Sequence, residues 1–214
     1  MDKVLKEISR WLWENSVDFV LKYTGGRGFN YHVFLSSPPR SPQSYVPLKI
    51  LKYWKDMSKK RLEEEIVKLS QNPFEITRDF LRCFAEYLRV KGLPIVHDLS
   101  IKAFEPDVIT IDAKSVKRRG YHRTFFSLRA REESIRVCLP VEKVDEWKNV
   151  IKISEHPEDV VKRKYEFEIQ INFTEPSFMD DFLEEFEKRL FEKHYNSLLK
   201  RIKKIPRDVP RSNS

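Results

Sequence analysis

The stretch that decides the fold reads KYTGGRGFNYHV and runs from Lys22 to Val33. Three glycines lie between positions 25 and 28, and glycine readily adopts the positive backbone angles that tight turns require. The segments on either side predict two strands, Asp18–Tyr23 and Gly28–Leu35, joined by this turn. The glycines also leave backbone amides open to a close ligand, and Arg27 adds a guanidinium suited to phosphate. Since an ordinary hairpin turn would use the same glycines, the motif alone leaves both interpretations open.

Periodicity on either side of this hairpin predicts an α+β fold. Helices with one apolar face are expected at Lys3–Ser16, Pro47–Gln71, Pro73–Val90 and about Phe178–Ile205. Further strands are expected at Pro94–Phe104, Val108–Ile111, Ile135–Leu139 and Lys164–Phe173. We therefore expect one domain over residues 1–205, with a helical insertion at about 47–91 and a polar tail at 206–214. The strand that ends near Asp112 should share one sheet with the two strands that flank the glycine turn.

Composition indicates a charged protein with a packed interior. The formal net charge is +8, which favours polyanionic partners, although a lysine-rich surface kept for solubility would give the same value. Charged residues make up 35% of the 214 residues, as is common in proteins from hot environments. The two cysteines, Cys83 and Cys138, lie in apolar contexts and predict buried free thiols. With no signal peptide and no membrane-spanning apolar run, we expect a cytoplasmic protein without membrane association.

A basic segment extends from Lys114 to Arg131. It contains seven basic residues and no acid, and Tyr121, Phe125 and Phe126 lie among them. Such a segment suits a nucleic-acid backbone, with rings available for stacking, although many charge runs are solvated loops. We predict nucleic-acid contacts for its first part, namely Lys114, Lys117, Arg118, Arg119 and Tyr121.

Two aspartates, Asp107 and Asp112, flank the apolar strand Val108–Ile111. A carboxylate at the end of a buried strand beside a basic segment is a suitable ligand for a two-metal site. An ordinary aspartate at a strand end is the alternative.

Together these segments resemble the catalytic small subunit of archaeal and eukaryotic DNA primases. One motif of that family has the order serine, glycine, two arginines, glycine, a hydrophobic residue, histidine and strand residues. Thr24, Gly25, Arg27, Gly28 and Val33 match this motif in register. The third motif of the family, with its following strand and proline, is resembled by Asp112, Arg123, Ser127 and the segment 140–147. The resemblance covers about Asp18 to Leu199.

The resemblance implies a primase-like mixed β-sheet core with a long C-terminal helix. It makes Asp112 the third ligand, or Asp107 the alternative ligand, of a site for Mg²⁺ or Mn²⁺. It also implies a set of nucleotide and phosphate contacts: Thr24, Gly25, Arg27, Gly28, Asn30, His32, Arg123, Ser127 and Arg129.

The activity implied is primer synthesis by nucleotidyl transfer, with nucleoside triphosphates and nucleic acid as ligands and a primase large subunit as partner. Two departures bear on it. Asn30 stands where the family has histidine, and only Met1 and Asp2 precede the helix that should follow a strand with paired aspartates. We therefore expect a primase-like protein that binds nucleotide and nucleic acid, with the isolated chain inactive and nucleotidyl transfer occurring only if the missing carboxylates are supplied. A non-catalytic relative that binds nucleic acid or a primase partner, and a repair-type polymerase of the same superfamily, are the alternatives.

Overall fold

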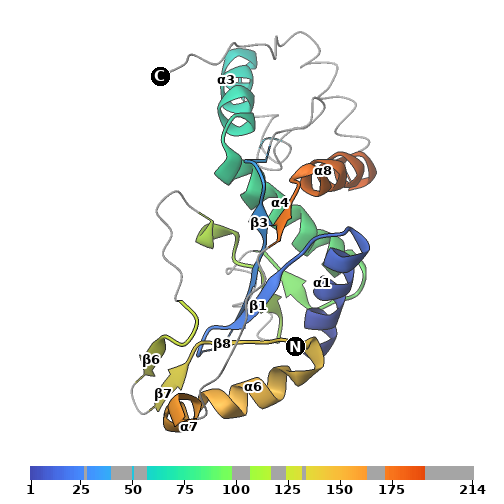
Figure 1. Cartoon of the computed structure of the whole chain (residues 1–214). Coiled ribbons are helices and arrows are strands. Elements are labelled where there is room, and N and C mark those ends of the chain that lie inside the picture. Colours follow the sequence, from blue (N-terminus) through green and yellow to red (C-terminus); the bar gives the residue numbers. More distant parts are fainter. Residues whose placement is uncertain are drawn as a thin grey trace. The chain divides into compact units, whose positions relative to one another are not determined.

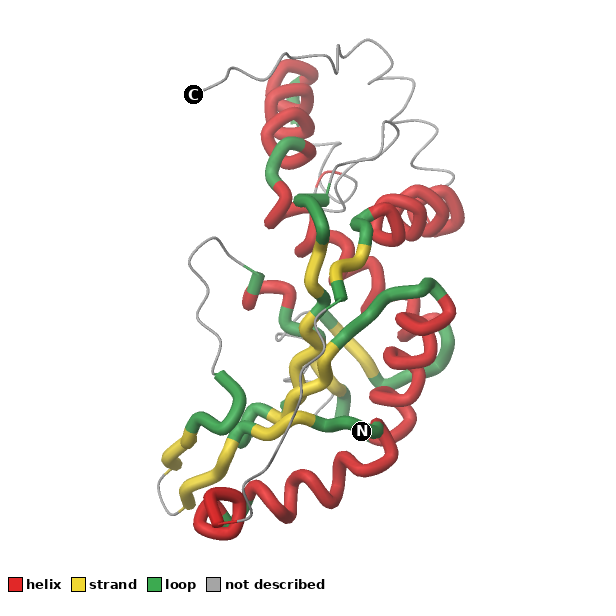
Figure 2. Tube along the Cα trace, in the orientation of Figure 1, coloured by secondary structure: helices red, strands yellow, loops and turns green. Residues whose placement is uncertain are grey.

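The computed structural model describes residues 1–26, 28–39, 50, 57–97, 107–116, 124–131, 134–162 and 172–190. These residues form both helices and strands, so the α+β class is confirmed (Figures 1 and 2). The chain separates into two compact units. Unit 1 comprises residues 1–36 and 119–175, and unit 2 comprises residues 37–118 and 176–214. Among the described residues, no helix combines the length and apolar character needed to cross a membrane.

The described residues of unit 1 form three small sheets. The antiparallel pair β1 (Val20–Tyr23) and β2 (Phe29–His32) is joined by β8 (Leu139–Pro140) in the order β2-β1-β8. A hairpin consists of β6 (Leu128–Arg131) and β7 (Ser134–Val137), and β3 (Phe34–Leu35) pairs in parallel with β9 (Phe173–Thr174). The helices are α1 (Asp2–Glu14), α6 (Trp147–Ser154) and α7 (Pro157–Lys162), with a 3₁₀ turn η3 (Val144–Glu146) before α6 (Figure 1).

The strands around the glycine turn pair as the sequence predicts. Val20 lies opposite His32 and Tyr23 opposite Phe29, so the turn joins two adjacent antiparallel strands. Because side chains alternate between the faces of a strand, one face carries Leu21 and Tyr23 into the unit 1 core. That core consists of Leu21, Tyr23, Val137, Leu139, Val141, Val150 and Val160. The glycine turn is therefore attached directly to a buried strand.

The described residues of unit 2 include α3 (Lys59–Ser70), α4 (Pro73–Val90), α8 (Ser177–Leu190), a 3₁₀ turn η2 (Ala113–Ser115) and two short strands. The strands β4 (Ile95–Val96) and β5 (Ile109–Thr110) form a parallel pair. Aromatic rings join α4 to α8, with centroids of Phe80 and Phe182 5.4 Å apart and those of Phe84 and Phe182 5.8 Å apart. These ring contacts hold α8 against α4, beside buried residues of both helices such as Ile76, Leu88 and Leu183.

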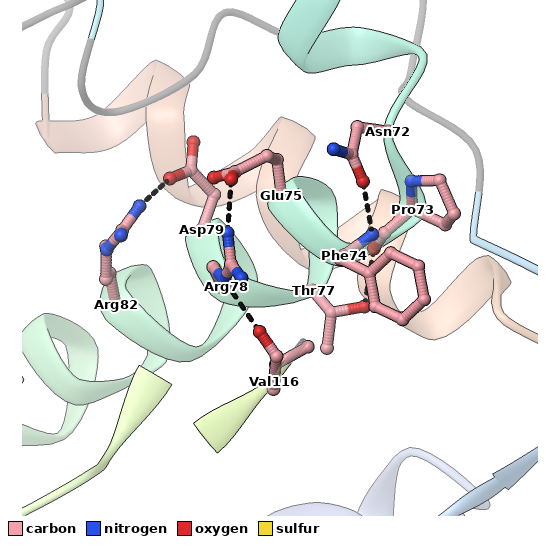
Figure 3. Close-up of polar contacts among 9 residues, drawn as sticks. All are labelled: Asn72, Pro73, Phe74, Glu75, Thr77, Arg78, Asp79, Arg82 and Val116. Carbon is pink, nitrogen blue, oxygen red and sulfur yellow. Dashed lines mark hydrogen bonds and ion pairs between the residues drawn. The ribbon is translucent and has the colours of Figure 1, made fainter. Parts of the chain in front are cut away.

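Polar contacts fix the start of α4 (Figure 3). The Asn72 side chain accepts a hydrogen bond from the Phe74 amide at 3.0 Å and caps the helix, as the predicted break at Asn72-Pro73 requires. Arg78 forms an ion pair with Glu75 and donates from Nε to the carbonyl of Val116 at 2.7 Å (Figure 3). Arg78 thus attaches the residue after η2 to α4.

Several predicted elements are corrected. The helix expected at Pro47–Gln71 is not continuous, because Met57 and Ser58 are non-helical and Ser58 caps α3 through the Arg61 amide at 3.4 Å. The strand expected at Ile135–Leu139 is two strands. Before Cys138 the strand β7 pairs with β6, and after Cys138 the strand β8 pairs with β1. The helices α6 and α7 and the strand β6 were not predicted at all.

The expectation that the strand before Asp112 shares a sheet with the glycine-turn strands is wrong for the described residues. The strand β5 pairs with β4 in unit 2, whereas β1 and β2 pair with β8 in unit 1. Parts of the strands expected at Pro94–Phe104 and Lys164–Phe173, and the end of the helix expected at Phe178–Ile205, lie outside the described residues. So do the segment 40–49 and the polar tail.

The hydroxyl of Tyr31 joins β2 to α1, and we expect it to make unit 1 sensitive to alkaline pH. It donates to the carbonyl of Leu5 at 2.8 Å and lies 3.0 Å from the Ser9 hydroxyl. Burial raises the pKa of Tyr31 from 10.0 to about 12, while the bond to Ser9 acts in the opposite direction. Because the unfolded chain ionises first, this stability is present below pH 10 and is lost as the pH rises toward 12, by up to about 2–3 kcal/mol.

The test compares the wild-type chain with Tyr31→Phe by urea denaturation from pH 8 to pH 11.5. The variant loses two hydrogen bonds and should be less stable at pH 8 by about 1 kcal/mol. Above pH 10 the difference between the two chains should shrink and then change sign, because ionisation of this phenol destabilises only the wild type, by more than the roughly 1 kcal/mol that its hydrogen bonds contribute at pH 8. A difference that stays constant across the range would contradict the assignment.

Candidate functional site

The glycine turn between β1 and β2 is closed by hydrogen bonds of its own residues. The amide and the hydroxyl of Thr24 both donate to the carbonyl of Gly28, at 3.1 and 2.9 Å. Gly25 has a φ of +67°, the left-handed conformation that favours glycine. The buried hydroxyl of Tyr23 donates to the carbonyl of Gly26 at 2.7 Å. Hydrogen bonds therefore close the turn and also connect it to the core strand β1.

The hairpin β6–β7 lies against this turn, and two glycines permit the approach. A Cβ atom placed on Gly26 would lie 1.9 Å from Nη1 of Arg129, so the Arg129 guanidinium occupies the space that a side chain would fill. A Cβ on Gly25 would lie 3.3 Å from Cβ of Arg129 and 3.5 Å from the carbonyl oxygen of Arg136. The predicted phosphate contacts Gly25 and Arg129 are thus brought together.

Arg136 is directly opposite Arg129 in the hairpin, so two arginines occupy the same face beside the turn. Nη1 of Arg136 donates to the Tyr23 hydroxyl at 3.0 Å, and Nη2 lies 2.7 Å from the carboxylate of Glu155, at the end of α6. The hydrogen bond to Tyr23 raises the pKa of Arg136; burial acts in the opposite direction, and the charges of Tyr23 and Glu155 make smaller contributions that raise it. The guanidinium is therefore charged at every physiological pH.

The other face of the β1–β2 pair carries Lys22, Asn30 and His32. Lys22 is opposite Asn30, and its side chain is buried, with 2% exposure. Its Nζ lies 5.3 Å from the ring centroid of Phe125, and the ring of His32 lies 6.2 Å from the same ring. A cation and an imidazole thus share an aromatic neighbour on the face away from the core.

Ser127 has structural hydrogen bonds. Its hydroxyl donates to the carbonyl of Thr124 at 2.8 Å, and its carbonyl accepts from the amide of Cys138 at 2.9 Å. These bonds hold the segment that leads into β6, so Ser127 lies next to the hairpin that carries Arg129.

The predicted metal ligands belong to unit 2. Asp112 caps η2, because its carboxylate accepts from the Lys114 amide at 3.0 Å and its carbonyl accepts from the Ser115 hydroxyl at 2.7 Å. Asp107 is exposed. Among the described residues, the one group of three or more side chains that could hold a metal is His156, Glu158 and Asp159, all exposed in unit 1. The described residues therefore do not assemble a carboxylate site around Asp107 or Asp112.

Several predicted contacts lie outside the described part of the chain: Arg27, Lys117, Arg118, Arg119, Tyr121 and Arg123. The sequence interpretation also missed Tyr23, Arg136 and Glu155. A signal for Arg136 was present, since two four-residue segments of strand character flank Glu132-Glu133 and place Arg129 and Arg136 in register. Nothing in the local sequence indicated Glu155.

Comparison of the chain with protein-family models, with curated proteins and with solved structures found no match.

Substitutions of the three glycines of the turn should separate backbone strain from side-chain contact. Gly25→Ala should lower the free energy of unfolding by about 1–2 kcal/mol, because alanine disfavours a positive φ. Gly26→Ala should be milder, since it meets the movable end of Arg129, and Gly28→Ala should be nearly neutral, since a Cβ there meets nothing within 4 Å. Urea denaturation followed by circular dichroism measures the three values. Equal losses at Gly25 and Gly28 would contradict the turn geometry.

Proposed function

We propose that this chain is a primase-like protein that binds the phosphate groups of nucleic acid or nucleoside triphosphates at the glycine turn, without transferring nucleotides by itself. The observation that carries the proposal is the guanidinium of Arg129 in the space beside Gly26. The turn and the segment that contains Ser127 and Arg129 are the two segments that the resemblance connects with the nucleotide. They come from distant parts of the sequence and meet in unit 1.

Charge supports the same proposal. Like charges directly opposite each other on a hairpin are destabilising, and Arg129 and Arg136 form such a pair. Glu155 already pairs with Arg136, so an anion bound beside both arginines would take the place of that carboxylate. Phosphate is well suited to this place, because guanidinium groups bind it through paired hydrogen bonds and a net charge of +8 attracts polyanions.

The catalytic part of the resemblance has less support. Two-metal transfer of a nucleotide would need several carboxylates beside the phosphate site to hold Mg²⁺ or Mn²⁺. The carboxylate of Asp112 caps η2, and its preceding strand belongs to a different sheet from the glycine turn. The competing possibility is that other carboxylates complete the site and the chain transfers nucleotides. The proposal is tested against it.

Binding is expected to depend on Arg129. In titrations of a labelled oligonucleotide at several salt concentrations, Arg129→Ala should weaken binding and reduce the salt slope by about one unit. Arg27→Ala and Arg123→Ala should act in the same direction. Lys60→Ala is the control, because it removes one charge from an exposed side chain of α3 in unit 2. If Lys60→Ala and Arg129→Ala have the same effect, the binding is non-specific attraction to a basic surface.

The full chain should not synthesise or extend primers. The assay uses labelled nucleotides with Mn²⁺, for the wild type and for Asp112→Asn. Wild-type synthesis that is lost in Asp112→Asn would overturn the non-catalytic proposal and would show that Asp112 binds metal despite its capping role.

A further inference from the structure

We infer that Arg136 is the second arginine of the anion site and that Glu155 is its displaceable internal counter-ion, which a bound phosphate replaces. The inference rests on the proposed phosphate binding at the glycine turn. It adds a residue outside the predicted set and an acid of the same chain that competes with the ligand.

The first argument is that Tyr23, and not Glu155, holds Arg136 in place. The Tyr23 hydroxyl is 3.0 Å from Nη1 of Arg136, and the Tyr23 side chain is buried, with 1% exposure. The same hydroxyl donates to the carbonyl of Gly26, so its position is fixed by the turn. Since Arg136 also lies in the paired strand β7, its guanidinium can stay beside the turn when Glu155 leaves.

The second argument is that Arg136 has donor capacity to spare. Its Nε is buried and has no hydrogen-bond partner among the residues that the structure describes. A guanidinium offers five N–H donors in a planar fork, and a phosphate can accept from two of them at once. Glu155 pairs with Nη2.

The third argument is that the pairing with Glu155 is weak enough to be exchanged. The Glu155 side chain is 42% exposed, and ion pairs between exposed side chains contribute little because water and salt screen them. Glu155 is also the C-cap residue of α6, where the partial negative charge of the helix end disfavours a carboxylate. A phosphate would therefore replace a carboxylate that its ion pair with Arg136 holds only weakly.

The experiment measures the affinity of the full chain for a fluorescently labelled single-stranded oligodeoxynucleotide at fixed salt. Glu155→Gln removes the competing charge and retains the shape of the side chain, and it should raise affinity by about two- to fivefold. Glu158→Gln is the matched control, because it removes the same charge from an exposed glutamate that lies beside His156. Its effect should be clearly smaller than that of Glu155→Gln.

Two further variants complete the test. Arg136→Ala should weaken binding, and Glu155→Gln should then have no additional effect in the Arg136→Ala background, because the competition acts through that guanidinium. Arg136→Lys, which keeps a charge without the fork, should recover only part of the affinity. Circular dichroism of each variant establishes that it is folded.

The outcomes separate the two proposals. If Arg129→Ala weakens binding but Glu155→Gln matches Glu158→Gln, or lowers affinity, the role of Glu155 is structural and this inference is overturned. If neither Arg129→Ala nor Arg136→Ala changes binding, the proposed phosphate site itself is wrong.

Discussion

The hydroxyl of Tyr23 is the contact on which the arrangement around the glycine turn depends. It lies at the end of a core strand, donates to the carbonyl of Gly26 and accepts from Arg136. A buried hydroxyl without partners would cost free energy, so the turn and the hairpin must both stay where they satisfy it. The Tyr23 ring packs in the unit 1 core, and its centroid lies 5.3 Å from that of Phe29. The Tyr23 side chain thus connects the core of unit 1 with both the turn and the hairpin.

The glycines have a second role once this contact is fixed. Gly25 has a positive φ, whereas Gly26 does not. Gly26 is needed for a different reason: the Arg129 guanidinium occupies the space that a side chain at position 26 would fill. The hairpin therefore places two arginines directly opposite each other beside the turn, an arrangement that is unfavourable unless a counter-ion compensates it. Natural sequences violate such local rules most often where function requires it. This conflict distinguishes the turn from an ordinary hairpin turn, which would need glycine for backbone angles alone.

Local patterns predicted local structure well and long-range pairing poorly. The helix Pro73–Val90 was predicted with its bounds, because an asparagine cap, a proline in the first turn and an apolar face agree there. The strands around the glycine turn were predicted for a similar reason. The partner of β5 could not be predicted, since strand alternation fixes which face is buried but does not specify which strand lies alongside. The change of partner at Cys138 has no local signal either, because the apolar pattern continues through it.

The basic segment from Lys114 to Arg131 shows the same limit for function. By sequence it is one stretch of positive charge, but the boundary between the two units falls between Arg118 and Arg119, and Lys114 belongs to unit 2 whereas Arg129 belongs to unit 1. Charge density therefore does not define the site. What distinguishes Arg129 is the glycine beside it and the arginine opposite it, both of which come from pairing that only the fold provides. Asp112 illustrates the converse. An aspartate that begins a short helical turn is satisfied by the amide two residues on, and that capping bond accounts for its presence without a metal ion.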